Sequence, residues 1–213
     1  MPEKGSEEKK IKLLVATRNF GKFKEFAHFF QELDLELLSL TDFPKIEKIP
    51  EPYSTFEENA KYKALYCFKK TGLLSLADDS GLEVEALGGA PGVLSARFAG
   101  EGASDEENNK KLLKLLEGLP EEKRKARFIC VLALALSDEQ VKMVRAETQG
   151  IITEAPRGNK GFGYDPIFYY PLSGKTFAEM EPEEKLKVSH RGKALQKMKL
   201  ILERILKENN TPL

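Results

Sequence analysis

The sequence predicts an α/β fold with a mixed, partly antiparallel central sheet that is flanked by helices. Apolar runs of strand length alternate with longer patterns whose apolar residues recur every three or four positions. The run from Phe128 to Leu136 is apolar on both faces, which is typical of a strand in the middle of a sheet. Ser137-Asp138-Glu139-Gln140 then leads as a turn into a second strand pattern, which predicts an antiparallel pair.

The first half of the chain predicts four strands and two helices. An apolar strand precedes a helical pattern that carries Phe23, Phe26, Phe30 and Leu33. The second helix starts at Ser54 or Thr55, because Glu57 and Glu58 follow there as in a capping box. The expected strands are residues 11–17, 35–40, 73–78 and 83–87, and the expected helices are residues 21–33 and 54–71.

The second half predicts a helix at 104–117, the hairpin strands 126–136 and 141–152, and a last helix at 190–207. The last helix has an apolar face that includes Leu195, Met198 and Ile205. We find no internal repeat, so residues 1–213 are expected to form a single domain, with residues 1–10 as a polar N-terminal extension.

The composition excludes several classes of protein. The chain has 34 acidic and 34 basic residues, and this zero net charge gives no polybasic field for nucleic acid. There is neither an apolar signal core at the start nor a long apolar span, so we expect a cytoplasmic protein without a membrane partner. Cys67 and Cys130 lie in apolar patterns and are expected to be small buried hydrophobes.

Asp78 and Asp79 form the most informative pair, because they stand where an apolar strand meets Ser80 and Gly81. A buried carboxylate at the rim of a sheet needs a metal, a cation or hydrogen bonds. Neighbouring strand residues point to opposite faces, so only one of the two should enter a given site. We expect Asp79 to act and Asp78 to support it; the alternative is a solvated β-turn.

Thr17-Arg18-Asn19-Phe20-Gly21-Lys22 lies between an apolar strand and a helical pattern. Free backbone N–H groups and the positive end of a helix meet at such a turn, which favours an anion. Asn19 and Thr17 can donate hydrogen bonds, and Lys22 supplies a positive charge. The alternative is that Thr17 or Asn19 only caps the helix.

Gly161 and Gly163 leave the ring of Phe162 uncrowded. A ring offered in this way can stack on a nucleobase, and Asp165 can accept hydrogen bonds from base N–H groups. The alternative is a glycine-rich hairpin with a buried Phe.

Ser189, His190 and Arg191 stand at the start of the last helix. Ser189 is a suitable N-cap, but a cation such as Arg191 opposes the helix dipole there. We therefore expect His190 and Arg191 to offer donors to a ligand oxygen. On the second helix, Lys63 lies one turn after Asn59 and shares a face that is suited to the same site.

Together these segments resemble the inosine triphosphate pyrophosphatase family, which hydrolyses non-canonical purine nucleoside triphosphates. The similar segments occur in the family's order from Ile11 to Leu206. They are Thr17–Lys22, Phe56-Glu57-Glu58-Asn59-Ala60, Ala77–Leu82, Gly88–Gly92 with Ser95-Ala96-Arg97, Gly161–Pro166 and Ser189-His190-Arg191.

The resemblance implies two lobes with the nucleotide site in the cleft between them, a homodimer, and Mg²⁺ as cofactor with Mn²⁺ as a substitute. It implies hydrolysis of ITP, dITP or XTP to the monophosphate and pyrophosphate. Asp79 would be the general base and a metal ligand. The second metal carboxylate lies in a variable stretch; we choose Glu47, with Glu51 and Glu58 as alternatives.

The resemblance also implies a set of substrate contacts. Lys22, Lys185 and Lys63 would offset the charge of the triphosphate, with help from Asn19. Phe162 would stack on the base, Asp165 would accept from ring N–H groups, and the Ser-His-Arg segment would donate to the 6-oxo oxygen. The expected substrate-binding residues are Thr17, Arg18, Asn19, Phe20, Gly21, Lys22, Lys63, Ser80, Phe162, Gly163, Tyr164, Asp165, Lys185, Ser189, His190 and Arg191.

Two alternatives remain open from the sequence. A pyrimidine-directed, Maf-like nucleotide pyrophosphatase could use similar acids, but it gives no reason for the Gly-Phe-Gly-Tyr-Asp and Ser-His-Arg segments. A non-catalytic nucleotide-binding module gives no reason for the Asp78-Asp79 pair.

Overall fold

A seven-stranded mixed sheet forms the centre of the protein, as the computed structural model shows for residues 10–209. Of the predicted extension 1–10, only Lys10 falls within the described residues. The strand order is β2-β1-β3-β4-β5-β6-β7. The strands are β1 (Ile11–Val15), β2 (Leu35–Ser39), β3 (Leu74–Val84), β4 (Lys125–Ala135), β5 (Val141–Ile152), β6 (Phe168–Tyr170) and β7 (Lys175–Thr176). β1 pairs in parallel with β2 and β3, and every other pair is antiparallel, which confirms the predicted fold class.

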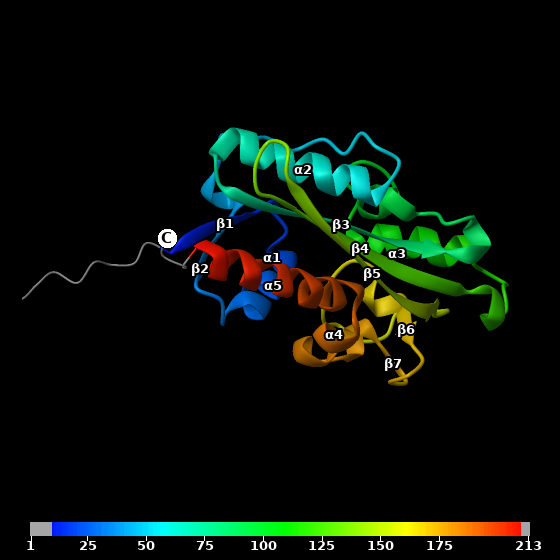
Figure 1. The fold of residues 1–213 in the computed structure, drawn as a ribbon. Coiled ribbons are helices and arrows are strands. Elements are labelled where there is room, and N and C mark those ends of the chain that lie inside the picture. The colour runs from blue at the N-terminus through cyan, green and yellow to red at the C-terminus, as the bar shows by residue number, and fades with distance from the viewer. Residues whose placement is uncertain (1–9, 210–213) are drawn as a thin grey trace, which may run out of the picture.

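Helices cover both faces of this sheet (Figure 1). They are α1 (Phe20–Phe30), α2 (Phe56–Thr71), α3 (Asp105–Leu115), α4 (Pro182–Val188) and α5 (His190–Asn209). α2 packs on one face in a core that includes Phe56, Ala64 and Ile129. α1 and α5 pack on the other face in a second core, around Phe26 and Met198.

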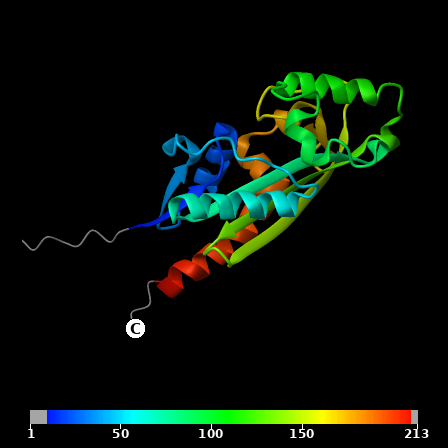
Figure 2. The ribbon, with the colours of Figure 1, turned by 90° about the horizontal axis from the view of Figure 1, so that it is seen from above.

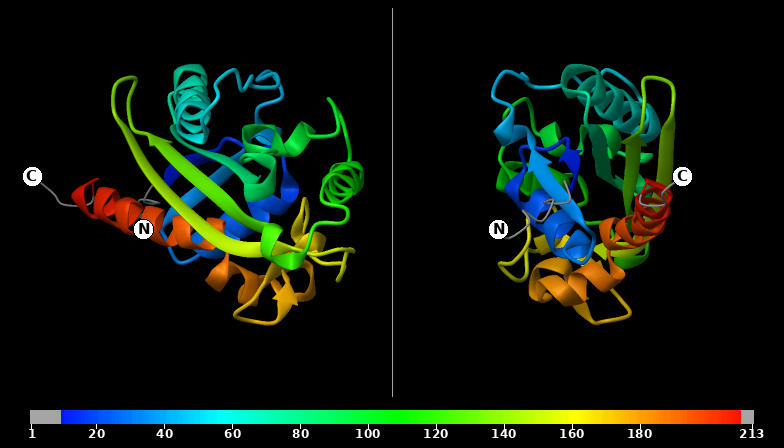
Figure 3. Two further views of the ribbon diagram at one scale, coloured as in Figure 1. Left: turned by 90° about the vertical axis from the view of Figure 1, so that its right-hand side faces the viewer. Right: turned by 60° about the vertical axis from the view of Figure 1, so that its left-hand side comes forward.

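The long strands β3, β4 and β5 extend beyond these two cores. Their far ends join a third apolar cluster that includes Leu112 of α3 together with Phe168 and Phe177. Seen from above, α3 lies beyond the end of α2 (Figure 2), and Figure 3 shows the long hairpin of β4 and β5 crossing the molecule between the helices. The division into two lobes stays a prediction.

The helix boundaries follow from local capping. Asn19 accepts a hydrogen bond from the backbone N–H of Lys22 at the start of α1. Thr55 caps α2, which ends at Gly72 in the left-handed conformation. Ser104 and Glu107 form a capping box at α3. These caps lie within two residues of the predicted helix starts.

One predicted element is wrong. The sequence predicts that a strand ends at Asp78, followed by a Ser-Gly turn and a new strand at 83–87. In the structure β3 continues without a break to Val84, and Glu85–Leu87 forms a short 3₁₀ turn. The reason is the antiparallel ladder with β4, which pairs Ser80 with Cys130 and Gly81 with Ile129 and so satisfies the backbone that a turn would otherwise use.

The sequence also misses β6, β7 and α4. The two strands are short and sit at the edge of the sheet, where the turn residues around them dominate the pattern. α4 has a recognisable start, since Pro182 stands in its first turn together with Glu183 and Glu184. Among residues 10–209, no helix has the length and apolar character that a membrane crossing requires.

A substitution at Gly81 tests whether β3 continues without a turn at this position. A Cβ on Gly81 would lie 2.6 Å from Ser95 Oγ and 2.8 Å from Phe56 Cε1, and it would also collide with the carbonyl oxygen of Gly92. Gly81→Ala is therefore expected to lower the free energy of unfolding by about 1–3 kcal/mol, measured by urea denaturation. If Gly81 lay in a solvated turn instead, the variant would unfold at the wild-type midpoint.

Candidate functional site

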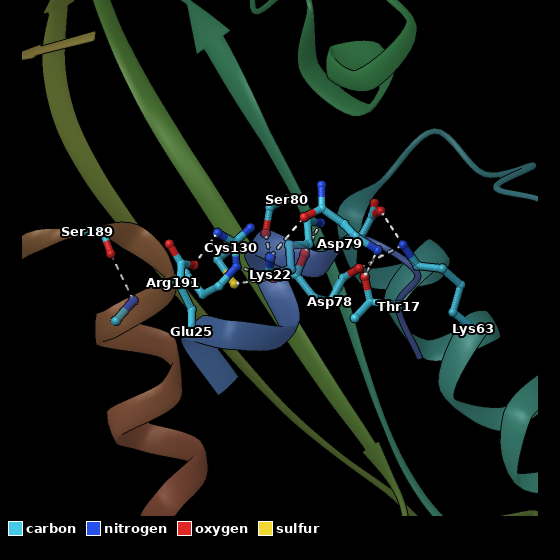
Figure 4. Close-up of polar contacts among 12 residues, drawn as sticks. Thr17, Lys22, Glu25, Lys63, Asp78, Asp79, Ser80, Cys130, Ser189 and Arg191 are labelled. Carbon is cyan, nitrogen blue, oxygen red and sulfur yellow. Dashed lines mark hydrogen bonds and ion pairs between the residues drawn. The ribbon is translucent and has the colours of Figure 1, made fainter. Parts of the chain in front are cut away.

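The site is organised by two adjacent carboxylates in the middle of β3. Asp78 is 4% exposed and Asp79 is 6% exposed, so both are buried in the sheet and neither lies in a turn. Their side chains point to opposite faces, as strand geometry requires. In Figure 4, Lys63 of α2 approaches this pair from one side, whereas Arg191 of α5 and Glu25 of α1 lie on the other side.

Asp79 belongs to an ion-pair cluster on the α2 face. The ammonium group of Lys63 lies 2.7 Å from Asp79 Oδ1, 2.8 Å from Glu51 Oε1 and 2.8 Å from the carbonyl oxygen of Asp78. Arg97 Nη1 lies 3.0 Å from the other oxygen of Glu51. Asp79 Oδ2 is buried and has no hydrogen-bond partner among the described residues. One carboxylate oxygen is thus fixed by a lysine, and the other is available to a ligand.

Burial and neighbouring charges shift the pKa values of Asp79, Glu51 and Lys63 in different directions. Burial raises the pKa of Asp79 to about 6 although Lys63 opposes the rise. Burial also acts to raise the pKa of Glu51, but Lys63 and Arg97 outweigh it and lower that pKa to about 2. For Lys63, burial would lower the pKa, yet Asp79 and Glu51 raise it above its ordinary value. Near neutral pH Asp79 is therefore ionised and still able to take a proton.

Asp78 is held on the opposite face by cations. Its Oδ1 accepts a hydrogen bond from Lys22 of α1, and its Oδ2 lies 2.9 Å from Arg191 Nε and 2.9 Å from Ser80 Oγ. Burial would raise the pKa of Asp78, but Arg191 and Lys22 outweigh it and hold the pKa well below its usual range. Asp78 therefore fixes two cations and is a poor proton acceptor.

A cavity of about 120 Å³ lies on the Asp78 side of the sheet. It is lined by Asn19, Lys22, Ser80, Gly81, Ser95, Ala96, Asp105, Asn108, Phe128, Phe162, Gly163, Tyr164, Asp165, Lys185, His190 and Arg191. Ten predicted substrate residues thus meet around one hollow: Asn19, Lys22 and Ser80 come from the first half of the chain, and the other seven come from the second half. Asp79, Glu51 and Lys63 do not line this cavity and lie on the other side of β3.

Phe162 forms one wall of the cavity. Lys185 Nζ lies 4.6 Å from the centre of its ring, and the guanidinium carbon of Arg191 lies 5.5 Å from it. Asp165 fixes this arrangement, since its Oδ2 lies 2.8 Å from the backbone N of Phe162 and 2.6 Å from Lys185 Nζ. Burial raises the pKa of Asp165, and Lys185 opposes that rise.

The residues at the start of α1 have separate roles. Asn19 and Lys22 line the cavity, and Gly21 packs against its Phe162 wall. A Cβ on Gly21 would lie 2.8 Å from the ring of Phe162, so only glycine permits this approach. Thr17 is buried and accepts a hydrogen bond from the backbone N of Asn19 at 3.0 Å. Arg18 donates to the carbonyl oxygen of Ile46.

Phe20 points away from the cavity, because its side chain is 69% exposed and lies under Lys24. Glu58 lies within the cap of α2, where it accepts a hydrogen bond from Thr55 Oγ1 at 2.7 Å. Glu47 is exposed and lies outside the Lys63 cluster. The structure therefore does not place our chosen second carboxylate, Glu47, beside Asp79. Glu51, four residues later, holds that position because Lys63 and Arg97 both bind it.

Ser189 and His190 differ in their access to the cavity. Ser189 Oγ accepts a hydrogen bond from the backbone N of Gly192 at 3.1 Å, which is the capping role. His190 lines the cavity and stacks on Phe128 with ring centres 4.5 Å apart. Burial, with help from Arg191, lowers the pKa of His190 well below its usual value, so the ring is neutral. Its Nδ1 has no hydrogen-bond partner within residues 10–209.

Sequence reasoning missed three residues that support the Phe162 wall. Asp105 accepts a hydrogen bond from the backbone N of Gly163 at 2.6 Å, and Asn109 donates to the carbonyl oxygen of Gly163 at 3.0 Å. Both stand in the first turns of α3, where a helix pattern alone gives them no assignment. Glu25 of α1 contacts Lys185 and Arg191, and in the sequence it resembles any solvated helix residue.

The donor set on the α2 face fits a hard divalent cation. The described part of the chain holds no cluster of three or more His, Cys, Asp and Glu side chains arranged for a metal. Mg²⁺ in phosphate sites typically takes one or two carboxylates and completes its shell with substrate oxygens and water. Asp79, with its unpartnered Oδ2, and the neighbouring Glu51 match that smaller requirement.

Comparisons with known proteins identify a matching family model and similar sequences. The model of the Ham1 family matches residues 13–201. A dITP/XTP pyrophosphatase of Syntrophobacter fumaroxidans is 51% identical over 195 residues, which cover 92% of this chain and 83% of that protein. A dITP/XTP pyrophosphatase of Geobacillus kaustophilus is 51% identical over 186 residues, covering 87% and 91%.

Solved structures are also similar to this chain. The structure of a HAM1 protein from Coxiella burnetii superposes with a TM-score of 0.84 at 41% identity, covering 91% of this chain and 99% of that one. A structure titled nucleoside-triphosphatase / dITP/XTP pyrophosphatase, from Mycobacterium abscessus, has a TM-score of 0.73 at 45% identity and covers 88% and 98%.

The raised pKa of Asp79 predicts a dependence of stability on pH. Between pH 3.8 and about 6 the folded protein keeps a proton on Asp79 that the unfolded chain has already lost. The wild type therefore loses stability as pH rises through this window, and between pH 4.5 and pH 8 it loses about 2 kcal/mol relative to Asp79→Asn. Urea denaturation of both proteins at pH 4.5 and pH 8 measures the difference. Glu139→Gln, in an exposed turn, is the control and should track the wild type. A constant difference between Asp79→Asn and wild type would contradict the raised pKa.

Proposed function

Since the chain belongs to the Ham1 family, we propose that it hydrolyses non-canonical purine nucleoside triphosphates such as ITP, dITP and XTP. The products are the nucleoside monophosphate and pyrophosphate. Curated relatives at about 50% identity over most of the chain carry the name dITP/XTP pyrophosphatase, which supports a purine substrate over the pyrimidine alternative.

The proposal rests on the different surroundings of two adjacent residues of β3, Asp78 and Asp79. Asp78 binds Lys22 and Arg191, which line a cavity with an aromatic wall, whereas Asp79 faces a lysine and a second carboxylate across the strand. Such an arrangement suits a substrate with a flat base at one end and a charged reacting group at the other. A module that only bound nucleotides would have no use for a buried carboxylate with a free oxygen and a pKa near 6.

The base is proposed to bind against Phe162. Arg191 supplies a donor to the 6-oxo oxygen of the purine, and Asp165 is suited to accept from ring N–H groups. We assign Lys185 to this end as well, in place of the triphosphate, because it lies at the Phe162 ring between Asp165 and Glu25. The neutral His190 ring closes the cavity beside Arg191.

The phosphates are proposed to lie near the start of α1. Asn19 and Lys22 line the cavity there, and the first turn of a helix favours negative charge. Lys22 already binds Asp78, so it stands between the base end and the reacting end. Lys63 lies on the far side of β3 and serves Asp79 directly.

Hydrolysis requires a base that removes a proton from the attacking water. We propose Asp79, because Lys63 fixes Oδ1 and leaves Oδ2 to accept the proton as water attacks the α-phosphorus. The bond between the α-phosphorus and the bridging oxygen breaks, and pyrophosphate leaves. Asp79 and Glu51 are the residues proposed to hold Mg²⁺, or Mn²⁺ in its place. When bound, such a cation lowers the pKa of a coordinated water and offsets phosphate charge.

The homodimer, the cytoplasmic location and the organisation of residues 1–213 as a single domain remain proposals that rest on the sequence.

The direct test of the proposed function is the product of an early time point. The purified protein is incubated with ITP and Mg²⁺, and nucleotides and phosphates are separated by chromatography. IMP and pyrophosphate are expected as first products, without IDP. IDP and orthophosphate would instead mean attack at the γ-phosphorus.

Asp79→Asn tests the proposed base. The change keeps the size of the side chain and removes its charge, so turnover of ITP should fall by about 10²–10⁴-fold. Steady-state assays at saturating Mg²⁺ measure the loss, and circular dichroism confirms that the variant is folded. Turnover within threefold of wild type would remove Asp79 from the mechanism.

Glu51 and Glu47 offer a matched pair for the second carboxylate. Loss of residues around a metal typically costs 10–100-fold in affinity, so Glu51→Gln should raise the Mg²⁺ concentration for half-maximal activity by about 10-fold or more. Glu47→Gln, four residues away and exposed, should leave it unchanged. Excess chelator should abolish activity of the wild type. The reverse ranking of the two variants would return the assignment to Glu47.

A further inference from the structure

The backbone of Gly163, next to Phe162 in the cavity wall, is held by two side chains of α3. Asp105 Oδ2 accepts a hydrogen bond from the backbone N of Gly163 at 2.6 Å, and Asn109 Nδ2 donates to the carbonyl oxygen of Gly163 at 3.0 Å. Asp105 and Asn109 stand four residues apart, so their side chains lie on the same face of the helix. We call these two residues the α3 clamp.

The clamp acts where the chain has no regular secondary structure. Residues 161–164 belong to no helix or strand, and Gly163 has a φ of +62°, a conformation that other residues rarely adopt. The backbone N of Phe162 donates to Asp165 Oδ2 at 2.8 Å. Side chains therefore satisfy backbone groups on both sides of the Phe162 ring. The direction of the ring depends on these contacts.

α3 gives the clamp a fixed support. The helix starts with the capping box of Ser104 and Glu107, and Leu112 anchors it in the third apolar cluster with no exposed surface. Asp105 stands in the first turn of α3, where the helix dipole favours a negative charge. The clamp is thus held by contacts that do not involve the cavity.

Asn109 has an unpaired atom that packing does not explain. The side chain is 7% exposed, and its Oδ1 is buried without a hydrogen-bond partner among residues 10–209. A buried acceptor without a partner costs free energy, and an apolar side chain of similar size would avoid that cost. What Asn109 provides instead is the hydrogen bond to Gly163. Such an unsatisfied group in a folded protein calls for a role beyond packing.

We propose that the α3 clamp positions Phe162 for stacking, and that it thereby raises the affinity for the base without selecting among purines. This inference rests on the proposed function. Stacking uses the aromatic face that every base has, so it adds affinity with little selectivity. Among the described residues, neither clamp residue hydrogen-bonds to Arg191, the proposed donor to the 6-oxo oxygen. Loss of the clamp should therefore weaken different purines by the same factor.

The test uses two variants that remove the clamp and two controls. Asp105→Ala removes the acceptor for the backbone N of Gly163, and Asn109→Leu removes the donor to its carbonyl oxygen at similar side-chain size. Asp105→Asn keeps an acceptor oxygen and should restore most of the effect. The matched control is Glu106→Ala, which removes an exposed carboxylate from the same helical turn.

The first readout is calorimetric binding of IMP and XMP, which needs no turnover. Asp105→Ala and Asn109→Leu should each weaken both nucleotides by about 3- to 10-fold. Asp105→Asn should lose less, and Glu106→Ala should match the wild type. In a Phe162→Ala background the same clamp substitutions should have no further effect, because the ring that they position is gone.

The second readout is steady-state hydrolysis. The KM for ITP should rise by the same factor as the dissociation constant of IMP, with kcat within about twofold of wild type. The ratio of kcat/KM for ITP to that for ATP should stay unchanged. The third readout is hydrogen exchange of the backbone amides of residues 158–168 without ligand, which should speed up in both clamp variants but not in Glu106→Ala.

These readouts separate positioning from stability and from the proposed function. A loss of IMP affinity that persists in the Phe162→Ala background overturns the inference, because α3 would then act through the fold as a whole. A changed ratio of ITP to ATP also overturns it, as does wild-type affinity for IMP in both clamp variants. If the wild type binds IMP but does not hydrolyse ITP, the proposed function fails while the binding and exchange readouts still decide the role of the clamp.

Discussion

The burial of two adjacent carboxylates in the central strand β3 is the constraint on which the rest of the site depends. Each of these charges would be costly inside the protein without a cation. Because neighbouring side chains of a strand point to opposite faces, the two cannot share one partner. Asp78 is satisfied by Lys22 and Arg191 from α1 and α5, and Asp79 is satisfied by Lys63 from α2. The helices on both faces of the sheet therefore supply the cations that neutralise these carboxylates, in addition to the apolar side chains that cover the sheet.

The two carboxylates differ in what they can do because their partners differ. Two cations and a hydroxyl occupy both oxygens of Asp78, so its charge is fixed and its pKa lies well below the usual range. Asp79 shares one lysine with Glu51 and keeps one free oxygen, and its pKa rises to about 6. A carboxylate that is fixed by cations and one that is proposed to react thus stand side by side in a single strand. The difference comes from the number of cations around each, since both are almost fully buried.

Several helices support the Phe162 wall of the cavity. The ring of Phe162 packs against Gly21, and the backbone beside it is held by Asp105 and Asn109 of α3. Its other supports are Lys185 and Arg191, which Glu25 joins from behind. Residues from α1, α3 and α5 therefore meet at one aromatic side chain, although they are far apart in the sequence. A change in any of these helices would therefore alter the cavity that is proposed to bind the base.

The sequence by itself determined the fold class, the approximate places of α1, α2, α3 and α5, the central position of β4 and β5, and the segments that supply the site. It could do so because apolar periodicity and capping are local properties. It mistook the Ser80-Gly81 step for a turn, because only the ladder with β4 shows that this backbone is already paired. It also passed over α4 and the two short edge strands.

Only the tertiary structure decided which charges meet. From the sequence we choose Glu47 over Glu51 as the second carboxylate, whereas it is Glu51 that ion-pairs with Lys63 and Arg97. Glu25 carries no sequence signal, since its partners are about 160 residues away. Lys185, which the resemblance assigns to the triphosphate, contacts Asp165 and the ring of Phe162 in the structure. Ion pairing in a buried site depends on three-dimensional distance and desolvation, and neither is encoded in the local pattern of the chain.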